Sequence, residues 1–263
     1  MSRGKHGAVA LLTGASSGLG RALAAALVSR GWRVALVARR AQALHEIAAN
    51  LGPAAIPVPL DLTVPGTVDH LRDALGERDI SPREVGLLVN NAAVGSFGSF
   101  LDTPSGRLGL MQHLNLRVPM ELTHWMAGVM VERGEGVVCN IASVAAFSAG
   151  PLMTEYYADK AWMRSFGLSL DAELRPRGVA VVTVCPGPFA SGFHAGAGMA
   201  QERMGRLKSA ESVARATIRA IERRQSLVAV GLGARLWAVL GPRLPWRFSR
   251  FVMYALQRRR LEG

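Results

Sequence analysis

The chain alternates short apolar runs with segments of helical periodicity, and this alternation restricts its fold more than any other feature. The apolar runs occupy residues 8–12, 33–38, 55–60, 86–90, 136–142, 179–185 and 227–230. They are rich in valine, leucine and isoleucine, as is typical of parallel strands buried on both faces. Helical spacing of apolar residues occurs between them, at residues 19–30, 42–50, 67–76 and 158–174. We therefore predict an α/β fold with a Rossmann-like, doubly wound parallel sheet of about seven strands.

A glycine-rich segment follows the first apolar run directly. Residues 13–20 read TGASSGLG and lead into the first helical segment. Glycines in such a turn let the backbone approach a ligand closely, so that a pyrophosphate can lie against the N-terminus of the helix. A glycine-rich loop alone often only makes a turn, but its place between a strand and a helix favours a dinucleotide site. The candidate contacts are Gly14, Ser16, Ser17, Gly18, Leu19 and Gly20.

The end of the second apolar run bears on the choice between NAD and NADP(H). A fold that selects NAD usually has an acidic residue there, which binds the ribose 2′-hydroxyl. This chain has Ala38 at that place, followed by Arg39 and Arg40. Guanidinium groups suit a 2′-phosphate, so we predict NADP(H) as the cofactor. The alternative is that both arginines are solvated residues at the start of a helix.

Polar residues also follow the third and fourth apolar runs. Asp61 and Leu62 come after the third run, and residues 90–93, which read NNAA, end the fourth. Because the carboxyl ends of parallel strands share one edge of the sheet, both segments are expected to meet the cofactor. The predicted contacts are Asp61, Leu62, Asn91, Ala92 and Ala93.

A tyrosine and a lysine four residues apart give the strongest chemical signal. Tyr156 and Lys160 lie in a helical segment, and Ser143 lies thirteen residues before Tyr156, after the fifth apolar run. Residues at this spacing share one face of a helix. An ammonium group beside a phenol lowers the phenol pKa, so the pair can exchange a proton near neutral pH. Taken alone, the pair also fits an ordinary helix surface.

The glycine-rich loop, the NNAA segment and the set of Ser143, Tyr156 and Lys160 together resemble the short-chain dehydrogenase/reductase family over about residues 8–191. The resemblance implies that Tyr156 is the general acid for carbonyl reduction and the base for the reverse reaction. It implies that Ser143 binds the substrate oxygen, and that Lys160 holds the nicotinamide ribose and lowers the pKa of Tyr156. It also implies that Asn115 supports a proton-relay water.

Two segments depart from the family pattern. Ala93 stands where the family has a glycine, which would let the backbone come closer to the cofactor. After the sixth apolar run, residues 186–191 read PGPFAS, similar to the family's P-G-x-V-x-T turn. The resemblance places this turn at the nicotinamide carboxamide, although a Pro-Gly pair is otherwise only a turn. The implied cofactor contacts are Pro186, Gly187, Phe189 and Ser191.

Apolar side chains follow the fourth, fifth and sixth runs, where this architecture places the nicotinamide end of the cofactor. They predict a small-molecule substrate that is an apolar carbonyl compound or secondary alcohol. Phenylalanine and methionine at such positions also commonly fill a core. The predicted substrate contacts are Val94, Phe97, Ala145, Phe147, Met153 and Phe193.

Basic charge is concentrated near the C-terminus. Fourteen lysines and arginines lie after residue 200 against four glutamates, in a chain whose net charge is +12. Residues 247–260 place Phe248, Phe251, Val252 and Ala255 at helical spacing beside arginines. Such a cationic, amphipathic helix can dock on the body, pack in a homo-oligomer or lie on an anionic membrane surface.

The 263 residues suit one α/β domain, with residues 1–231 as its dinucleotide-binding catalytic part and 232–263 as a basic helical extension. Cys139 and Cys185 lie inside apolar runs, and the six histidines lack ligand spacing, so we expect no disulfide framework and no metal. No run fits a signal sequence or a membrane span, which predicts a cytoplasmic protein, with peripheral membrane contact through the extension as an alternative.

Two functions of different classes fit these observations. The first is an NADP(H)-dependent oxidoreductase that interconverts a carbonyl and a secondary alcohol. The second is a catalytically idle dinucleotide-binding regulator with a basic interaction tail. The intact set of Ser143, Tyr156 and Lys160 favours the enzyme, because a regulator does not need a proton-transfer group. We further expect a homo-oligomer and no nucleic-acid partner.

Overall fold

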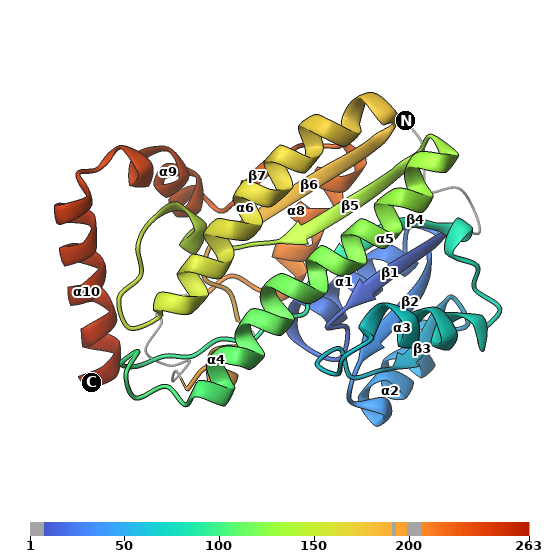
Figure 1. The fold of residues 1–263 in the computed structure, drawn as a ribbon, viewed down its shortest axis with the longest axis horizontal. Helices are drawn as coiled ribbons and strands as arrows, with labels where there is room; N and C mark the ends of the chain where they lie inside the picture. Colours follow the sequence, from blue (N-terminus) through green and yellow to red (C-terminus); the bar gives the residue numbers. More distant parts are fainter. Residues whose placement is uncertain (1–7, 191–192, 199–206, 263) are drawn as a thin grey trace.

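A seven-stranded parallel sheet forms the centre of the molecule (Figure 1). The computed structural model describes residues 8–190, 193–198 and 207–262. The strand order is β3-β2-β1-β4-β5-β6-β7, so the chain changes direction across the sheet between β1 and β4. The predicted doubly wound sheet is confirmed. Its strands are β1 (Val9–Thr13), β2 (Arg33–Ala38), β3 (Ala55–Pro59), β4 (Val85–Asn90), β5 (Gly136–Ile141), β6 (Val179–Pro186) and β7 (Leu227–Val230).

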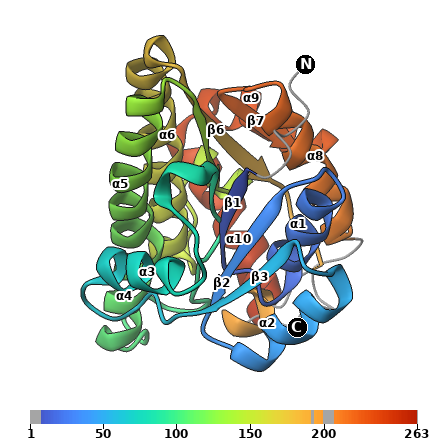
Figure 2. The same ribbon diagram turned by 90° about the vertical axis from the view of Figure 1, so that its right-hand side faces the viewer.

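Helices cover both faces of the sheet (Figure 2). Alternate residues of β1 show why its sequence is apolar throughout: Ala10 and Leu12 belong to the core on one face, and Val9 and Leu11 to the core on the other. The first core includes α1 (Gly18–Val28), α2 (Ala41–Leu51) and α8 (Ala210–Glu222). The second includes α3 (Thr67–Gly76) and α5 (Val118–Arg133), with α6 (Thr154–Leu174) packed beside β6.

A π-helical turn interrupts the long helical segment after β4. Helix α4 (Ser105–Gln112) is followed by the π turn His113–Arg117 and then by α5, which has a proline in its first turn. Single π turns carry one extra residue per turn and often occur at functional sites. This one contains the buried Asn115.

The chain after β7 forms two helices at one end of the molecule (Figure 1). These are α9 (Leu232–Leu240) and α10 (Trp246–Glu262), so the helix predicted over residues 247–260 is present. Helix α10 buries Met253 and Gln257, whereas Phe251 and Val252, from the predicted apolar stripe, are exposed. The short helix α7 (Phe193–Gly196) lies between β6 and α8 in the chain. Among the described residues, no helix is long and apolar enough to span a membrane.

Candidate active site

A cavity of about 680 Å³ is lined by the loops that follow β1 to β6, and by α6, α7 and α10. The order in which strands are added reverses between β1 and β4. The loops after the strands on the two sides of this point therefore diverge around a common space. All but one of the predicted cofactor contacts line this cavity, and Ser191 lies outside the described residues. They are Gly14, Ser16, Ser17, Gly18, Leu19, Gly20, Arg39, Arg40, Asp61, Leu62, Asn91, Ala92, Ala93, Tyr156, Lys160, Pro186, Gly187 and Phe189.

Two glycines allow the loop after β1 to fold back on itself. Gly14 has a φ of +68°, and a Cβ atom at this position would lie 2.8 Å from the Cα atom of Ala92. A Cβ atom on Gly20 would lie 2.1 Å from the carbonyl oxygen of Gly14. Neither position has space for a side chain, so close backbone packing alone requires glycine at both.

Polar side chains tie this loop to the end of β4. The Thr13 hydroxyl donates to the carbonyl of Val89 and accepts hydrogen bonds from the backbone N–H groups of Asn91 and Ala92. The Asn91 amide donates in return to the carbonyl of Thr13 at 2.9 Å and to that of Gly14 at 3.2 Å. The loops of the two central strands are thereby held in one fixed arrangement.

Arg39 and Arg40 lie at the end of the cavity that is formed by the loops after β1, β2 and β3. Both are exposed, and Arg40 donates hydrogen bonds to the hydroxyl and the carbonyl of Ser16 in the glycine-rich loop. Burial raises the pKa of Asp61, but hydrogen bonds from Thr63 and the charge of Arg39 outweigh it, so the net shift is downward. Asp61 is therefore a carboxylate, and the Arg39 guanidinium stabilises its charge.

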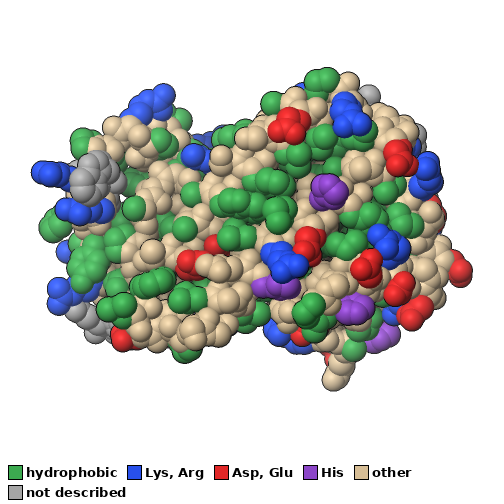
Figure 3. All heavy atoms as spheres, in the orientation of Figure 1, with side chains coloured by type: hydrophobic (Ala, Val, Ile, Leu, Met, Phe, Trp, Pro, Cys, Tyr) green, Lys and Arg blue, Asp and Glu red, His purple; other side chains and the backbone are tan. Residues whose placement is uncertain are grey.

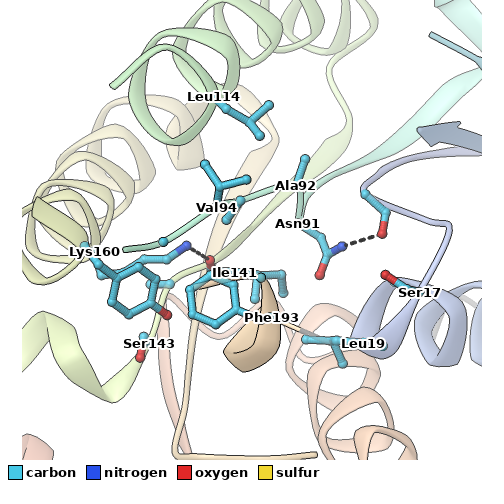
Figure 4. A pocket seen from close by; sticks show the side chains of 18 of the residues that line it. Ser17, Leu19, Asn91, Ala92, Val94, Leu114, Ile141, Ser143, Lys160 and Phe193 are labelled. Atoms are coloured by element: carbon cyan, nitrogen blue, oxygen red, sulfur yellow. Dashed lines mark hydrogen bonds between the residues drawn. The ribbon is translucent and has the colours of Figure 1, made fainter. Parts of the chain in front are cut away.

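Ser143, Tyr156 and Lys160 line the other end of the cavity. Figure 4 shows Ser143 and Lys160 there, with Phe193 beside them. The Lys160 ammonium donates to the carbonyl of Ile141 at 2.9 Å and lies 5.7 Å from the centre of the Tyr156 ring. Ser143 forms a side-chain hydrogen bond with Tyr156 and accepts another from the backbone N–H of Ala145. A hydroxyl, a phenol and an ammonium are thus brought together from β5 and α6.

The pKa of Tyr156 is shifted in the direction opposite to the prediction. Burial raises the pKa of this phenol well above its usual value, and the hydrogen bond with Ser143 opposes the shift only in part. The lowering expected from Lys160 is not found in this arrangement. Burial also lowers the pKa of Lys160 to about 8, because charged forms are disfavoured away from water. At neutral pH, Tyr156 carries its proton and is therefore suited to donate one.

Asn115 does not line the cavity. Its side chain is fully buried in the π turn, where its oxygen accepts from the backbone N–H of Val94 and its amide donates to the carbonyl of Val94. The same amide donates to the carboxylate of Asp159 at 2.6 Å. The side chain thus holds the loop after β4 against α6.

Asp159 is an acidic residue that the sequence analysis did not select. It is 2% exposed, lies next to Lys160 in the chain, and interacts with the charges of Lys160 and Glu155. Burial raises the pKa of Asp159 to about 6, although the hydrogen bond from Asn115 opposes this shift. Its negative charge in turn raises the pKa of Lys160, against the larger effect of burial.

This coupling predicts a pH effect of Asp159→Asn. Without the carboxylate, the pKa of Lys160 should fall below its present value of about 8, because the largest effect that opposes burial is then removed. Activity that needs the charged lysine should therefore be lost at a lower pH than in the wild type. The alkaline limb of the kcat/KM profile reports this free-enzyme group. Asp69→Asn, on exposed α3, is the control, and an unmoved alkaline limb in folded Asp159→Asn would contradict the prediction.

Four of the six predicted substrate contacts, Val94, Ala145, Met153 and Phe193, line the cavity. Phe193 packs on Tyr156 with 4.9 Å between the ring centres. Phe97 does not line the cavity, and Phe147 is buried in a separate cluster with the Arg164 guanidinium over its ring. These two predicted residues therefore lie outside the described cavity lining, and loop position alone does not show which way a side chain points.

The structure adds residues that sequence reasoning missed. Arg107, on α4, donates to the carbonyls of Gly95 and Gly196, and thus joins the loop after β4 to α7. Gln257, on α10, is 1% exposed and donates to the Tyr157 hydroxyl at 3.2 Å. Both line the cavity together with Tyr157 and Leu114. No local motif marks Arg107 or Gln257, which reach the site only through tertiary packing.

The cavity fits a nicotinamide dinucleotide. It extends without a break from the glycine-rich loop and the two arginines to the Tyr156 hydroxyl, and the tight Gly14 turn lets backbone approach a ligand closely. The residues of the glycine-rich loop would hold one end of such a dinucleotide and Lys160 the other. Among the described residues, no group of three or more His, Cys, Asp or Glu side chains is placed to hold a metal ion.

The fold and the cavity define a Rossmann-like α/β protein with a serine, tyrosine and lysine cluster at the switch point of its sheet. The family described as short chain dehydrogenase matches residues 8–202. The chain belongs to this family.

Individual relatives agree with this assignment. The chain is 34% identical over 192 residues to a short chain dehydrogenase from Pseudocercospora fijiensis, covering 71% of this chain and 61% of the relative. It is 31% identical over 185 residues to the very-long-chain 3-oxoacyl-CoA reductase of Anas platyrhynchos, covering 68% and 59%. The match thus spans about three fifths of these two relatives. Among solved structures, a short-chain dehydrogenase from Sphingobium yanoikuyae in complex with NADPH has a TM-score of 0.80 at 28% identity, covering 90% of this chain and 93% of the other.

Proposed function

We propose that the protein is an NADP(H)-dependent oxidoreductase that interconverts a carbonyl group and a secondary alcohol. The observation that carries this proposal is the meeting of Ser143, Tyr156 and Lys160 at one end of a cavity whose other end is the glycine-rich loop. A positioned acid beside a hydrogen-bonding hydroxyl is what carbonyl reduction requires of a protein. Family membership supports this reading.

The roles of the residues follow from their surroundings. The bound nicotinamide supplies or accepts a hydride. Tyr156 gives its proton to the carbonyl oxygen during reduction and takes it back during oxidation, and its raised pKa keeps the proton in place until the oxygen becomes basic. Ser143 hydrogen-bonds the same oxygen, and Lys160, at the same end of the cavity, would hold the nicotinamide ribose. Asn115 acts as a positioning residue through Val94 and Asp159.

The choice of NADP(H) rests on charge. Ala38 offers no carboxylate to a ribose hydroxyl, and Arg39 and Arg40 give the cavity two guanidinium groups at the corresponding place. The NADPH complex of the Sphingobium yanoikuyae relative is consistent with this preference. A 3-ketoacyl-(acyl-carrier-protein) reductase from Brucella melitensis, 27% identical to this chain, was solved with NADH, so the family does not decide the question.

The walls of the cavity support an apolar substrate. Val94, Leu114, Met153 and Phe193 lie around the end where Tyr156 stands. The names of two relatives point the same way: the very-long-chain 3-oxoacyl-CoA reductase of Anas platyrhynchos and the ketoacyl reductase HetN of a Nostoc species, the latter 30% identical over 233 residues. We propose a ketone or secondary alcohol with an apolar body.

We also propose how the chain is divided and assembled. Residues 1–231 supply the sheet and the proton-transfer cluster, and residues 232–263 form an extension of the same domain, because Gln257 of α10 lines the same cavity. We propose a homo-oligomer as well, on the ground of family membership. The regulator hypothesis is less well supported, since it gives the assembled cluster no role.

The test compares NADPH and NADH consumption over a panel of apolar ketones. We expect turnover with NADPH and a preference for it over NADH. Arg39→Ala/Arg40→Ala should weaken NADPH binding at least about tenfold and leave NADH binding within about threefold, because charge-assisted hydrogen bonds contribute roughly 1.5–3 kcal/mol each. Arg177→Ala, exposed at the opposite edge of the sheet, is the control. Equal losses for both cofactors would refute the NADP(H) assignment, and binding without turnover on any ketone would favour the regulator.

A further inference from the structure

The last two helices combine exposed apolar side chains with a one-sided charge. Residues 232–261 contain seven arginines and no aspartate, glutamate or lysine. Six of these arginines are exposed in the structure: Arg235, Arg243, Arg247, Arg250, Arg258 and Arg259. A segment of this composition has a positive potential along its whole length, and no acidic side chain within it offsets that potential.

Helix α9 presents one apolar face to solvent. Leu232, Leu236, Val239 and Leu240 follow i, i+4, i+7 and i+8 spacing, and their exposed fractions are 84%, 61%, 53% and 44%. The other side of the helix packs on the body, where Ala234 is buried. The helix is thus anchored by one side and leaves its more apolar side uncovered.

Helix α10 repeats this arrangement. Its anchoring side chains are Met253 and Gln257, whereas Phe251 is 71% exposed and Val252 and Tyr254 are also exposed. In Figure 3 hydrophobic and basic side chains lie together over the end of the molecule formed by α10. Packing of α10 on the body therefore leaves apolar side chains of this helix exposed to solvent.

A second copy of the chain is a poor occupant for this surface. Two such surfaces packed face to face would bring the seven arginines of one copy against those of the other, with only Glu262 in each pair of helices to offset them. An anionic bilayer complements both properties, since its headgroups attract the arginines and its acyl boundary accepts the leucines and the phenylalanine.

We propose that this surface, named here the α9/α10 face, binds peripherally to anionic membranes. It consists of Leu232, Leu236, Val239, Leu240 and Phe251, with Arg235, Arg243, Arg247, Arg250 and Arg259. The binding is reversible and interfacial, with α9 and α10 lying at the headgroup level.

The α9/α10 face adjoins the cavity, so membrane binding would place the substrate site next to the bilayer. Gln257 of α10 lines the cavity and donates to Tyr157, so the helix that meets the bilayer is also a wall of the substrate site. An apolar substrate dissolved in the bilayer would enter directly from it. This second step rests on the proposed function, whereas membrane binding itself does not.

The experiment is co-sedimentation of the full chain with vesicles of neutral phosphatidylcholine, with or without about 30% phosphatidylglycerol. We expect binding to the anionic vesicles at low salt and a loss of at least about tenfold at 0.5 M salt or on neutral vesicles. Leu232→Glu/Leu236→Glu should lose binding to a similar extent. Ala49→Glu/Val64→Glu adds the same charge at exposed sites on α2 and after β3, and should bind like the wild type.

Further measurements separate the alternatives. A full chain that remains in the supernatant with anionic vesicles at low salt overturns the proposal. So does a Leu232→Glu/Leu236→Glu variant that still sediments, or one that changes the oligomeric mass in light scattering without losing vesicle binding. Tyr156→Phe should still sediment, and Leu232→Glu/Leu236→Glu should keep its turnover on a water-soluble ketone. Failure of membrane binding is thereby distinguished from failure of the proposed activity.

Discussion

Tyr156→Phe is expected to lower turnover by at least about 100-fold, the contribution typical of a positioned general acid. The ring and its contact with Phe193 are kept, and only the hydroxyl that meets Ser143 is removed. NADPH binding should therefore stay within about twofold of the wild type. Steady-state NADPH consumption measures the first quantity, and fluorescence titration of the enzyme with NADPH measures the second.

Tyr157→Phe provides the matched control from the adjacent position. The Tyr157 hydroxyl accepts a hydrogen bond from Gln257 on α10, and the ring stands 6.3 Å from that of Tyr156 in an edge-on arrangement. Its loss should change KM for the ketone by no more than about fivefold, which corresponds to one hydrogen bond of about 1 kcal/mol, and leave kcat largely intact. If Tyr157→Phe is inactive and Tyr156→Phe is active, the assignment of the acid is wrong.

Gly20→Ala should abolish NADPH binding and destabilise the protein. The added Cβ would lie 2.1 Å from the Gly14 carbonyl oxygen and 2.8 Å from its carbon, and both are backbone atoms that no side-chain rotation can move. The glycine-rich loop has to shift, and with it the hydrogen bonds that Asn91 makes to this loop. We expect a loss of NADPH affinity of at least about 100-fold, since close backbone approach to the pyrophosphate is lost.

The control for Gly20→Ala is Gly128→Ala on α5. Gly128 is exposed, and a Cβ atom there would meet nothing within 4 Å. Alanine is favoured over glycine inside a helix by up to about 1 kcal/mol, so this variant should be as stable as the wild type or more so. Thermal unfolding and NADPH titration of both variants give the comparison. Normal NADPH affinity in Gly20→Ala would show that the loop does not hold the cofactor.

The sheet could be predicted from the sequence because its strands are buried on both faces. In β1, successive residues belong alternately to the two cores, so every position is apolar and the run stands out from its surroundings. The loop after each strand then leads to the same edge of a parallel sheet. For this reason the positions of Arg39, Asp61, Asn91 and Ser143 around one cavity followed from strand ends alone.

Other parts of the site depend on contacts that no local pattern encodes. Phe147 is buried away from the cavity because it packs in a separate apolar cluster. Gln257 reaches the cavity because α10 packs against the body next to Tyr157. The pairing of Asn115 with Asp159 joins positions 44 residues apart through a π turn that sequence periodicity does not reveal. The direction of the Tyr156 pKa shift also required the structure, because burial of the phenol outweighs its hydrogen bond with Ser143.

The contribution of α10 to the cavity separates two parts of the site along the chain. The glycine-rich loop, the two arginines and the set of Ser143, Tyr156 and Lys160 all precede residue 188, whereas Gln257 comes from the final helix. A change in α10 can therefore reshape one wall of the cavity without replacing any of these earlier residues.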